Sequence, residues 1–287
     1  FCNTNLSIVD VEEKDIWSDL DELVFKSDEP VHSMAALVQS HAWERIASDG
    51  YKVMLHGSAN DEIMLGYDYL KKIELKNRLR SGEFSNLARD LIFEPINFLK
   101  LTKWLYGEKE TNDIYSNYFS PQMKESNHGR YLSFTEKVKE LNKKTKSRMY
   151  EDLINLRVPY WCNLMDKNMM AVPVEVRMPF LDYKFLDFIF TVPTKYLLRN
   201  GYTKYLLRHS MKGLLPEEIL WQRKKIGFSN PKKSWRNKGE QLLINELNNS
   251  KLASILDVSV LRKNIKTLDE RFLWRVLNFC IWYRVNK

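Results

Sequence analysis

The sequence predicts a helix-rich α/β protein, and three observations support this prediction. Glycine and proline are scarce, at 10 and 9 of 287 residues, while stretches rich in Leu, Lys and Glu dominate. The apolar run at 53–55 is followed by small and acidic residues, which is typical of a strand entering a loop and a helix. The order strand, helix, strand, loop, helix in the first 75 residues predicts a parallel sheet with crossover helices.

The first elements follow in order along the chain. Residues 6–9 form a short β-prone run, and residues 11–25 are an acidic segment with apolar residues at helical spacing. Pro30 ends that segment, because the residue before a proline resists the helical conformation. We expect a helix over 33–47, which Asp49 and Gly50 end, and then a strand over 51–56.

Beyond this strand we expect mostly helices. One begins at Asp61, and a succession of helices runs over residues 71–156. Its breaks are expected at 81–86, 93–97 and 124–131. Two further helices are expected over 183–191 and 270–285, the second amphipathic and engaged only in packing. Three methionines are interpreted as core residues rather than as part of a binding site: Met165, Met169 and Met170.

The net charge of +8 comes largely from three lysine-rich runs, at 71–80, 137–148 and 223–238. A basic excess indicates either nucleic acid or another polyanion, such as the phosphates of a nucleotide. Acids and apolar residues interleave with the first two runs, so we interpret these as solvated helix faces. Nucleic-acid binding would then rest on charge alone, and we regard it as unlikely.

The three cysteines are far apart and show neither metal-ligand spacing nor a disulfide framework, which favours a reducing, cytoplasmic location. No apolar run has the length of a membrane span, so no membrane partner is expected.

Four segments, in their order and spacing, resemble the C-terminal synthetase domain of glutamine-dependent asparagine synthetases. They are residues 55–67 (LHGSANDEIMLGY), 165–182, 192–228 and 273–284. EVRMPFLD, followed by a Lys-x-Gly-Phe loop, is the specific part of the resemblance, whose other relatives include β-lactam synthetases and lasso-peptide cyclases. It covers nearly the whole chain. It implies part of a parallel-sheet, adenine-nucleotide-binding (PP-loop ATPase-like) domain, with the remaining α/β portion over 1–75 and a mostly helical portion over 76–287.

The resemblance implies an ATP-dependent carbon–nitrogen ligase. Such enzymes bind ATP and Mg²⁺, convert a carboxylate into an acyl-adenylate with release of pyrophosphate, and form an amide when ammonia or an amine attacks. Each step has a physical demand. Pyrophosphate needs cations, the metal needs acidic oxygens, and the incoming amine needs a base that takes its proton.

The resemblance assigns roles to residues of the loop after the expected strand. Asp61 matches a magnesium ligand, although an acid at a helix N-terminus also fits the helix dipole. Glu62 beside it supports either the metal shell or the helix start. His56 and Gly57 match positions near the nucleotide, where glycine lets the backbone approach a ligand. His56 stands where a serine is usual, and a purely structural role for it stays open.

Three basic residues match the nucleotide-binding positions of the family. Lys225, of the Lys-x-Gly-Phe loop, corresponds to the lysine that meets pyrophosphate and the charge of the transition state, a task that suits its compact ammonium. The alternative for Lys225 is a solvated surface loop. Lys204 and Arg208 match a lysine–arginine pair, and their spacing of four places them on one face of an expected helix.

Glu175 and Arg177 match the Glu-x-Arg that precedes Pro-Phe-Leu-Asp in the family. The resemblance implies that these two residues bind the substrate. Glu175 either binds the substrate amine or serves in proton transfer. A structural ion network explains Arg177 and Asp182 equally well.

The sequence departs from the family pattern in two ways. The phosphate-binding run Ser-Gly-Gly-x-Asp-Ser is absent from these residues, as is the glutaminase domain. Because such a loop supplies the backbone donors for ATP phosphates, we expect the upstream half to lie outside this chain, upstream or on a partner chain. At Ser58 asparagine synthetases carry an acid and β-lactam synthetases a tyrosine. A serine hydroxyl is too weak a base unaided.

The change at Ser58 leaves three alternatives: Glu175 or Glu62 supplies the base, the nucleophile is another amine, or activity is lost. We therefore expect an amide-forming ligase for a specialised carboxylate, such as a peptide, sugar acid or metabolite, rather than aspartate. The competing hypothesis is a non-catalytic, synthetase-like binding or scaffold module. A homo-oligomer is compatible with either.

Overall fold

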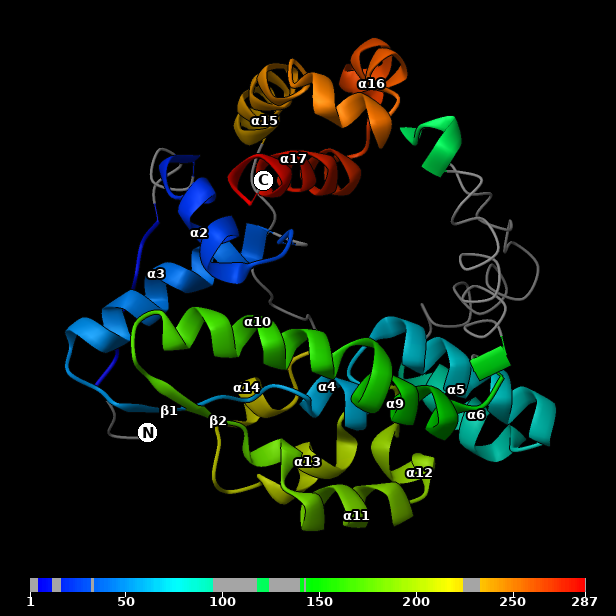
Figure 1. Ribbon diagram of the computed structural model, residues 1–287. Coiled ribbons are helices and arrows are strands. Elements are labelled where there is room, and N and C mark those ends of the chain that lie inside the picture. The colour runs from blue at the N-terminus through cyan, green and yellow to red at the C-terminus, as the bar shows by residue number, and fades with distance from the viewer. Residues whose placement is uncertain are drawn as a thin grey trace.

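The structure is a computed structural model that describes residues 5–11, 17–31, 34–94, 118–123, 140–141, 143–223 and 233–286. Within these ranges the chain is predominantly helical, with one small sheet beside helix α10 (Figure 1). The predicted helix-rich α/β character is confirmed. None of the helices formed by the described residues is long and apolar enough to cross a membrane.

The sheet consists of β1 (Val53–Leu55) and β2 (Glu175–Arg177), which pair in parallel with Val53 opposite Glu175 and Leu55 opposite Arg177. The prediction of a parallel sheet is confirmed, although β1 is shorter than the expected strand and its partner is β2 rather than the run at 6–9. The sequence does not mark β2, because a single apolar residue between two charged ones is too short an alternation to indicate a strand. Met54 and Val176, at the strand centres, pack on Met165 and Met169 of α10.

The largest core lies among the two ends of the chain. It is built by α2 (Leu20–Ser27), α3 (Met34–Ser48), α15 (Lys233–Glu246), α16 (Val258–Asn264) and α17 (Glu270–Val285). In Figure 1 the blue N-terminal helices lie beside red α17. The Trp274 indole N–H donates to the Val31 carbonyl at 2.8 Å, which satisfies a buried polar group of this core. The helices expected over 33–47 and 270–285 are confirmed.

A second core joins α5 (Asp68–Ser81), α6 (Phe84–Phe93), α9 (Thr145–Glu151) and α12 (Thr194–Leu197). Helix α9 continues through a π-helical turn (Asp152–Leu156) into α10 (Val158–Met170). Pro159 explains this change of pitch, because proline has no N–H to donate to the carbonyl four residues earlier. The predicted break near 81–86 is confirmed at Gly82 and Glu83, whereas the break at 124–131 lies outside the described residues.

A third group consists of short helices that lie beside and below the sheet in Figure 1. It comprises α4 (Asn60–Ile63), α11 (Tyr183–Thr191), α13 (Tyr205–Ser210) and α14 (Glu217–Leu220), with short 3₁₀ turns at Pro179–Leu181, Ser250–Ser254 and Ile265–Thr267. Ile63 of α4 and Ile189 of α11 are fully buried in the same apolar cluster. The helix expected over 183–191 is confirmed as α11, and the helix expected from Asp61 is a single turn.

Three predictions are wrong in detail. Residues 6–9 form no strand, and Leu6 and Ile8 are exposed. Met165 and Met169 are core residues as predicted, but Met170 is 59% exposed because it ends α10 on its outer side. The run 71–80 is no solvated face, since Lys71, Glu74 and Arg78 are all buried. Their charges are paired inside the protein, and the period of the apolar residues alone cannot reveal this.

Candidate active site at the end of strand β1

The candidate site begins where β1 ends. The backbone N–H of His56 donates to the carbonyl of Arg177 at 2.9 Å, so this residue still follows the sheet. Ala59 then adopts a left-handed conformation with φ +73°, which is uncommon for a residue with a Cβ. This turn brings Asn60 and Asp61 to the start of α4, beyond the carboxyl end of the strand. In open parallel sheets, ligands bind at this end of the strands.

Asp61 and Lys204 form an ion pair, with Nζ 2.8 Å from Oδ1. Lys204 also donates to the Asn60 side-chain oxygen, while the Asn60 amide donates to the Gly57 carbonyl. Both charged side chains are about one-fifth exposed. The loop and the lysine are therefore held as one polar unit that solvent reaches.

Gly66 makes this ion pair possible. A Cβ atom at Gly66 would lie 1.8 Å from Oδ1 of Asp61 and 2.6 Å from Cε of Lys204. Real Cβ atoms essentially never show such distances, so any other residue at position 66 would force the Asp61 and Lys204 side chains to move. Sequence reasoning did not single out Gly66, although it lies inside the segment at 55–67. Gly57 differs, because a Cβ there would meet only the Asn60 amide at an ordinary 3.6 Å.

The prediction that Lys204 and Arg208 share a helix face is wrong. Helix α13 begins at Tyr205, and Lys204 before it has φ +54°. Lys204 turns towards Asp61, while Arg208 donates to the carbonyls of Thr203, at 2.9 Å, and Leu220. Burial lowers the pKa of the Arg208 guanidinium. Arg208 therefore braces the segment that carries Lys204.

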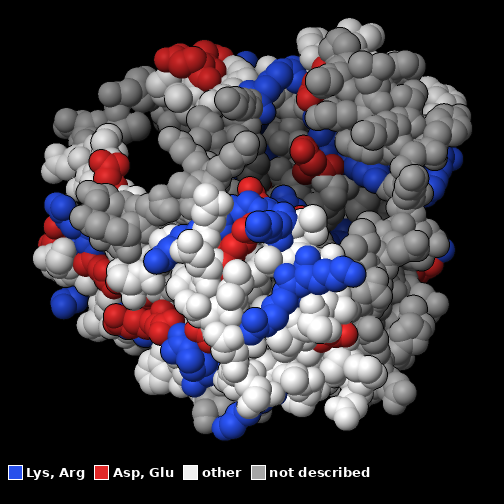
Figure 2. All heavy atoms as spheres, turned by 90° about the horizontal axis from the view of Figure 1, so that it is seen from above, with Lys and Arg blue, Asp and Glu red and all other residues white. Residues whose placement is uncertain are grey.

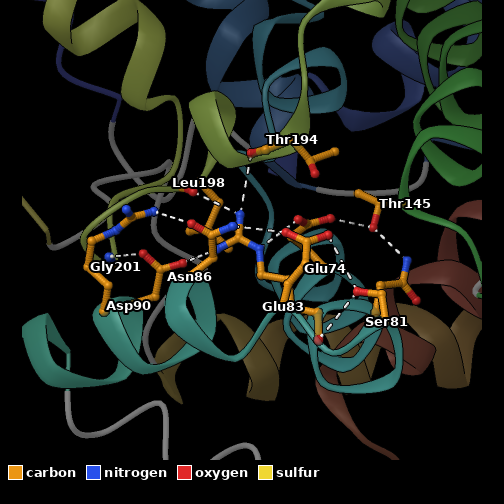
Figure 3. A network of polar contacts seen from close by, with 12 residues as sticks. Glu74, Ser81, Glu83, Asn86, Asp90, Thr145, Thr194, Leu198 and Gly201 are labelled. Atoms are coloured by element: carbon orange, nitrogen blue, oxygen red, sulfur yellow. Dashed lines mark hydrogen bonds and ion pairs between the residues drawn. The ribbon is translucent and has the colours of Figure 1, made fainter.

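Residues 198–203 form the turn before Lys204, and a buried ionic network contacts this turn (Figure 3). Arg78, only 1% exposed, contacts Glu74 at 2.8 Å and Asp90, and its guanidinium donates to the Leu198 carbonyl at 2.9 Å. Asp90 in turn accepts from the Gly201 N–H at 3.1 Å. Helices α5 and α6 thus hold the backbone on both sides of the turn. No sequence pattern singled out Arg78 or Asp90.

A second set of charges contacts the same turn at Gly201 and Tyr202. Lys71 donates to the Gly201 carbonyl at 3.0 Å and to Glu94 at 2.5 Å. Arg223 lies 3.5 Å from Glu94, and its guanidinium covers the Tyr202 ring at 3.9 Å. Arg223 is the last described residue before the Lys-x-Gly-Phe loop. Lys225 itself lies outside the described residues.

Ser58 lies beside the His56 ring. Nδ1 of His56 and Oγ of Ser58 are 2.7 Å apart, and the hydroxyl also lies 3.5 Å from the Met165 sulfur. Both residues are partly buried. Burial lowers the pKa of His56, so its imidazole is neutral at neutral pH. The two residues form a hydroxyl–imidazole pair at the strand end.

Glu62 points away from Asp61 into the protein and is 2% exposed. The Tyr67 hydroxyl donates to its carboxylate at 3.0 Å, and burial raises the pKa of this carboxyl group. The Arg157 guanidinium covers the Tyr67 ring at 4.7 Å and the Tyr69 ring at 4.8 Å. Sequence reasoning missed these partners: the two tyrosines lie at the start of α5, and Arg157 lies just before α10. The contact between Glu62 and Tyr67 therefore holds α4 against the start of α5.

Glu175 and Arg177 lie on β2, exposed and paired with each other at 2.7 Å. The Arg177 guanidinium holds the pKa of the Glu175 carboxyl below its usual value. Glu175 pairs with Val53 at the start of β1, about 10 Å along the strand from His56. The structure therefore brings the Arg177 backbone, but not Glu175, to the loop. Asp182 accepts from the Lys184 and Phe185 N–H groups and caps α11, and it forms no ion pair with the residues that the structure describes.

The donor set suits a metal held mainly by phosphates. Among the described residues no three acidic, histidine or cysteine side chains cluster as ligands. Mg²⁺ often takes one or two carboxylates together with substrate phosphates and water. Asp61, as a single partly exposed carboxylate beside a lysine, fits that pattern. On the face drawn in Figure 2, Lys and Arg side chains of the described residues are interspersed with Asp and Glu.

Comparison with known proteins shows which family the chain is similar to. The profile of the asparagine synthase family matches residues 1–284. The glutamine-hydrolysing asparagine synthetase 1 of Bacillus subtilis is 27% identical over 98% of this chain and 48% of its own length. Asparagine synthetase 3 of the same organism is 26% identical over 75% of the chain and 32% of its own length. The asparagine synthetase of Gallus gallus is 41% identical over 24% of the chain and 14% of its own length.

The chain thus spans about half the length of the first of these relatives and less of the others. The match nevertheless covers almost every residue of this chain and includes the loop after β1, the Lys204 turn and helix α17. This chain belongs to the asparagine synthase family.

Proposed function

We propose that the chain is the synthetase part of an ATP-dependent amide-forming ligase. The enzyme converts a carboxylate into an acyl-adenylate with release of pyrophosphate, and ammonia or an amine then forms the amide. The observation that carries the proposal is the Asp61–Lys204 pair, built around Gly66 beyond the carboxyl end of a parallel strand. A carboxylate that can bind a metal ion and an ammonium group that can bind phosphate are what a metal–nucleotide complex needs at this position.

Each charged residue then has a role. Asp61 would hold Mg²⁺, which would supply positive charge beside the phosphates of ATP. Lys204 binds phosphate oxygens of ATP, and Arg208 keeps the backbone before Lys204 in place. Lys225 stabilises the leaving pyrophosphate. Arg223, fixed on Glu94 and Tyr202, supports this assignment because it anchors the start of the loop that carries Lys225.

We propose further that the fold is PP-loop ATPase-like and is completed by an upstream half or a partner chain. Parallel sheets are normally covered on both faces. Here one face of the two-stranded sheet is bare, with Val53 42% and Leu55 72% exposed. The absent Ser-Gly-Gly-x-Asp-Ser loop would be supplied by this other part. The residues at 1–75 form the remaining α/β portion, and those at 76–287 the helical portion. A cytoplasmic location and a homo-oligomer are compatible with this assignment.

Ser58 points to a specialised carboxylate, such as a peptide, sugar acid or metabolite, rather than aspartate. Glu175 or Arg177 contacts this substrate at the exposed end of β2, and the backbone of His56 and Gly57 lies near the nucleotide. Nucleic acid and membranes are not expected partners. The alternative, a non-catalytic scaffold, is favoured only by the absent phosphate-binding run and by Ser58.

The test is carboxylate-dependent exchange of labelled pyrophosphate into ATP, measured with the chain and the polypeptide that supplies the phosphate-binding loop. A panel of amino acids, peptides and sugar acids replaces the unknown substrate. Asp61→Ala and Lys225→Ala should each abolish exchange, whereas Lys184→Ala, at an exposed lysine of α11, should not. Exchange that survives both active-site substitutions shows that the site is assigned wrongly. Absence of exchange with every carboxylate favours the scaffold.

A further inference from the structure

The histidine and the serine at the end of β1 are positioned for proton transfer. Nδ1 of His56 lies 2.7 Å from Oγ of Ser58, a normal hydrogen-bond length. Met165, buried in α10, contacts the same hydroxyl at 3.5 Å and fixes the side of the loop on which it lies. Both side chains keep part of their surface exposed, so a substrate can reach the pair.

The pair can take a proton that the hydroxyl of Ser58 alone cannot. A serine hydroxyl is a poor base at neutral pH, whereas a neutral imidazole accepts a proton readily. Partial burial of His56 disfavours its charged form and keeps the imidazole neutral before the reaction. With Nδ1 as acceptor, the hydroxyl of Ser58 donates to the ring and its oxygen is available to a second donor.

The two carboxylates that compete for the role of base are badly placed. Glu62 is almost fully buried and accepts a hydrogen bond from Tyr67, so an incoming amine does not reach it. Glu175 lies at the other end of the strand, where Arg177 occupies its carboxylate and makes it a weaker base. The His56–Ser58 pair, by contrast, lies three residues from Asp61 in the same loop.

We propose that His56 is the general base of amide formation and acts through the hydroxyl of Ser58. The inference rests on the proposed function. The amine nitrogen bonds to the acyl carbon, and the bond from that carbon to the adenylate oxygen breaks, so AMP leaves with the electron pair. The nitrogen loses one proton to Oγ of Ser58 while Ser58 passes its own proton to Nδ1 of His56. The imidazolium then releases this proton to water.

The two half-reactions separate this role from every other role of the loop. Pyrophosphate exchange reports adenylation, which needs no amine. Amide formation with ammonia reports the second step. The complete enzyme is used, with the carboxylate that gives the strongest exchange in the panel described above. His56→Asn keeps a polar side chain without a base, Ser58→Ala removes the relay, and Ser58→Thr keeps a hydroxyl.

In His56→Asn and Ser58→Ala, exchange should stay within about threefold of the wild type. Amide formation from ammonia should fall about 10²- to 10³-fold, the usual contribution of a positioned base. Ser58→Thr should retain most of the rate, and so should His209→Gln, the matched control at an exposed histidine of α13. Added imidazole should partly restore amide formation in His56→Ala.

Hydroxylamine provides an independent readout, because it is a stronger nucleophile than ammonia and depends less on a base. Its product should fall less than about tenfold in His56→Asn. Ser58→Glu, which places a carboxylate at the same position, should make amide formation independent of His56. A structural role for the pair would change both nucleophiles and both half-reactions together.

Three results would overturn the inference, and they differ from one another. Exchange and ammonia-dependent amide formation that both persist in His56→Asn show that the base lies elsewhere. Equal loss of both half-reactions shows that the pair only shapes the nucleotide site. Absence of exchange in the wild type with every carboxylate refutes the proposed function itself, and the general-base role with it.

Discussion

The ammonium group of Lys204 lies 2.8 Å from the carboxylate of Asp61, although the two residues are far apart in sequence. The backbone N–H of Lys204 also donates to the carbonyl of Met64 at 3.1 Å, so the contact is secured by main chain as well as side chain. The loop after β1 and the turn before α13 therefore behave as one unit. A substitution that disturbs the loop should therefore also displace the turn, and the reverse.

Gly66→Ala tests how tightly this unit is packed. The new methyl group would overlap Oδ1 of Asp61, so the Asp61–Lys204 pair must separate. We expect a loss of about 1–3 kcal/mol in the free energy of unfolding, measured by urea denaturation. Pyrophosphate exchange should fall together with it. Gly57→Ala, where the nearest side-chain atom is 3.6 Å away, should change the free energy of unfolding by less than about 1 kcal/mol.

If Gly66→Ala were as stable as Gly57→Ala, the close approach around Gly66 would not be a feature of the folded protein.

Arg78→Met tests the buried network under the Lys204 turn. Removing the guanidinium leaves Glu74 and Asp90 buried without their partner, which should cost about 3–5 kcal/mol of unfolding free energy. Adding Glu74→Gln and Asp90→Asn should recover much of that loss, because the buried charges are gone. Lys143→Met removes an exposed pair with Glu140 and should cost less than about 1 kcal/mol. Urea denaturation of the wild type, Arg78→Met, the triple variant and Lys143→Met measures these free energies of unfolding.

A loss of the same size in the triple variant as in Arg78→Met would mean that shape rather than charge makes Arg78 important.

The sequence predicted the elements whose pattern is regular and long. Helices α3, α11 and α17 combine apolar periodicity with recognisable ends, such as the Asp269 side chain that accepts from two N–H groups of α17. The parallel character of the sheet was predicted, but its pairing was not, because the strand expected at 6–9 does not form and β1 pairs with β2 instead. Strand β2 could not be predicted, because its identity as a strand comes from pairing with β1 and not from its own three residues.

The candidate site was predicted as a set of separate residues and not as an arrangement. Resemblance placed Asp61, Lys204 and Ser58 in the site, but not the contacts between Asp61 and Lys204 or between Ser58 and His56. Gly66 gave no signal of its own, since only the folded structure shows what a methyl group there would meet. Long-range packing, which no local pattern encodes, therefore accounts for the difference.

His56 should make stability depend on pH. Partial burial of the imidazole beside Ser58 lowers the pKa of His56, so the unfolded chain binds a proton at a higher pH than the folded protein. Stability from this group is therefore present above about pH 6.5, the usual pKa of histidine, and is lost as the pH falls through the lowered value. The drop in Tm between pH 7.5 and 5.5 should be smaller in His56→Gln than in the wild type.

His209→Gln, at an exposed position of α13, is the matched control and should keep the wild-type drop in Tm. An unchanged drop in His56→Gln would show that the imidazole is not held neutral by the fold.

Leu55→Glu tests whether the bare face of the sheet is covered by the polypeptide that completes the enzyme. Leu55 is 72% exposed and pairs with Arg177 on a face that parallel sheets normally bury. The substitution should leave the Tm of this chain alone within about 2 °C, because exposed substitutions cost little. Its affinity for the upstream half, measured by analytical ultracentrifugation, should fall at least about tenfold, because a buried leucine is replaced by a charge.

Ile244→Glu, at an exposed apolar residue of α15, should leave the affinity unchanged. Equal affinities of Leu55→Glu and the wild type would place the contact surface elsewhere and leave the open sheet face without an assigned partner.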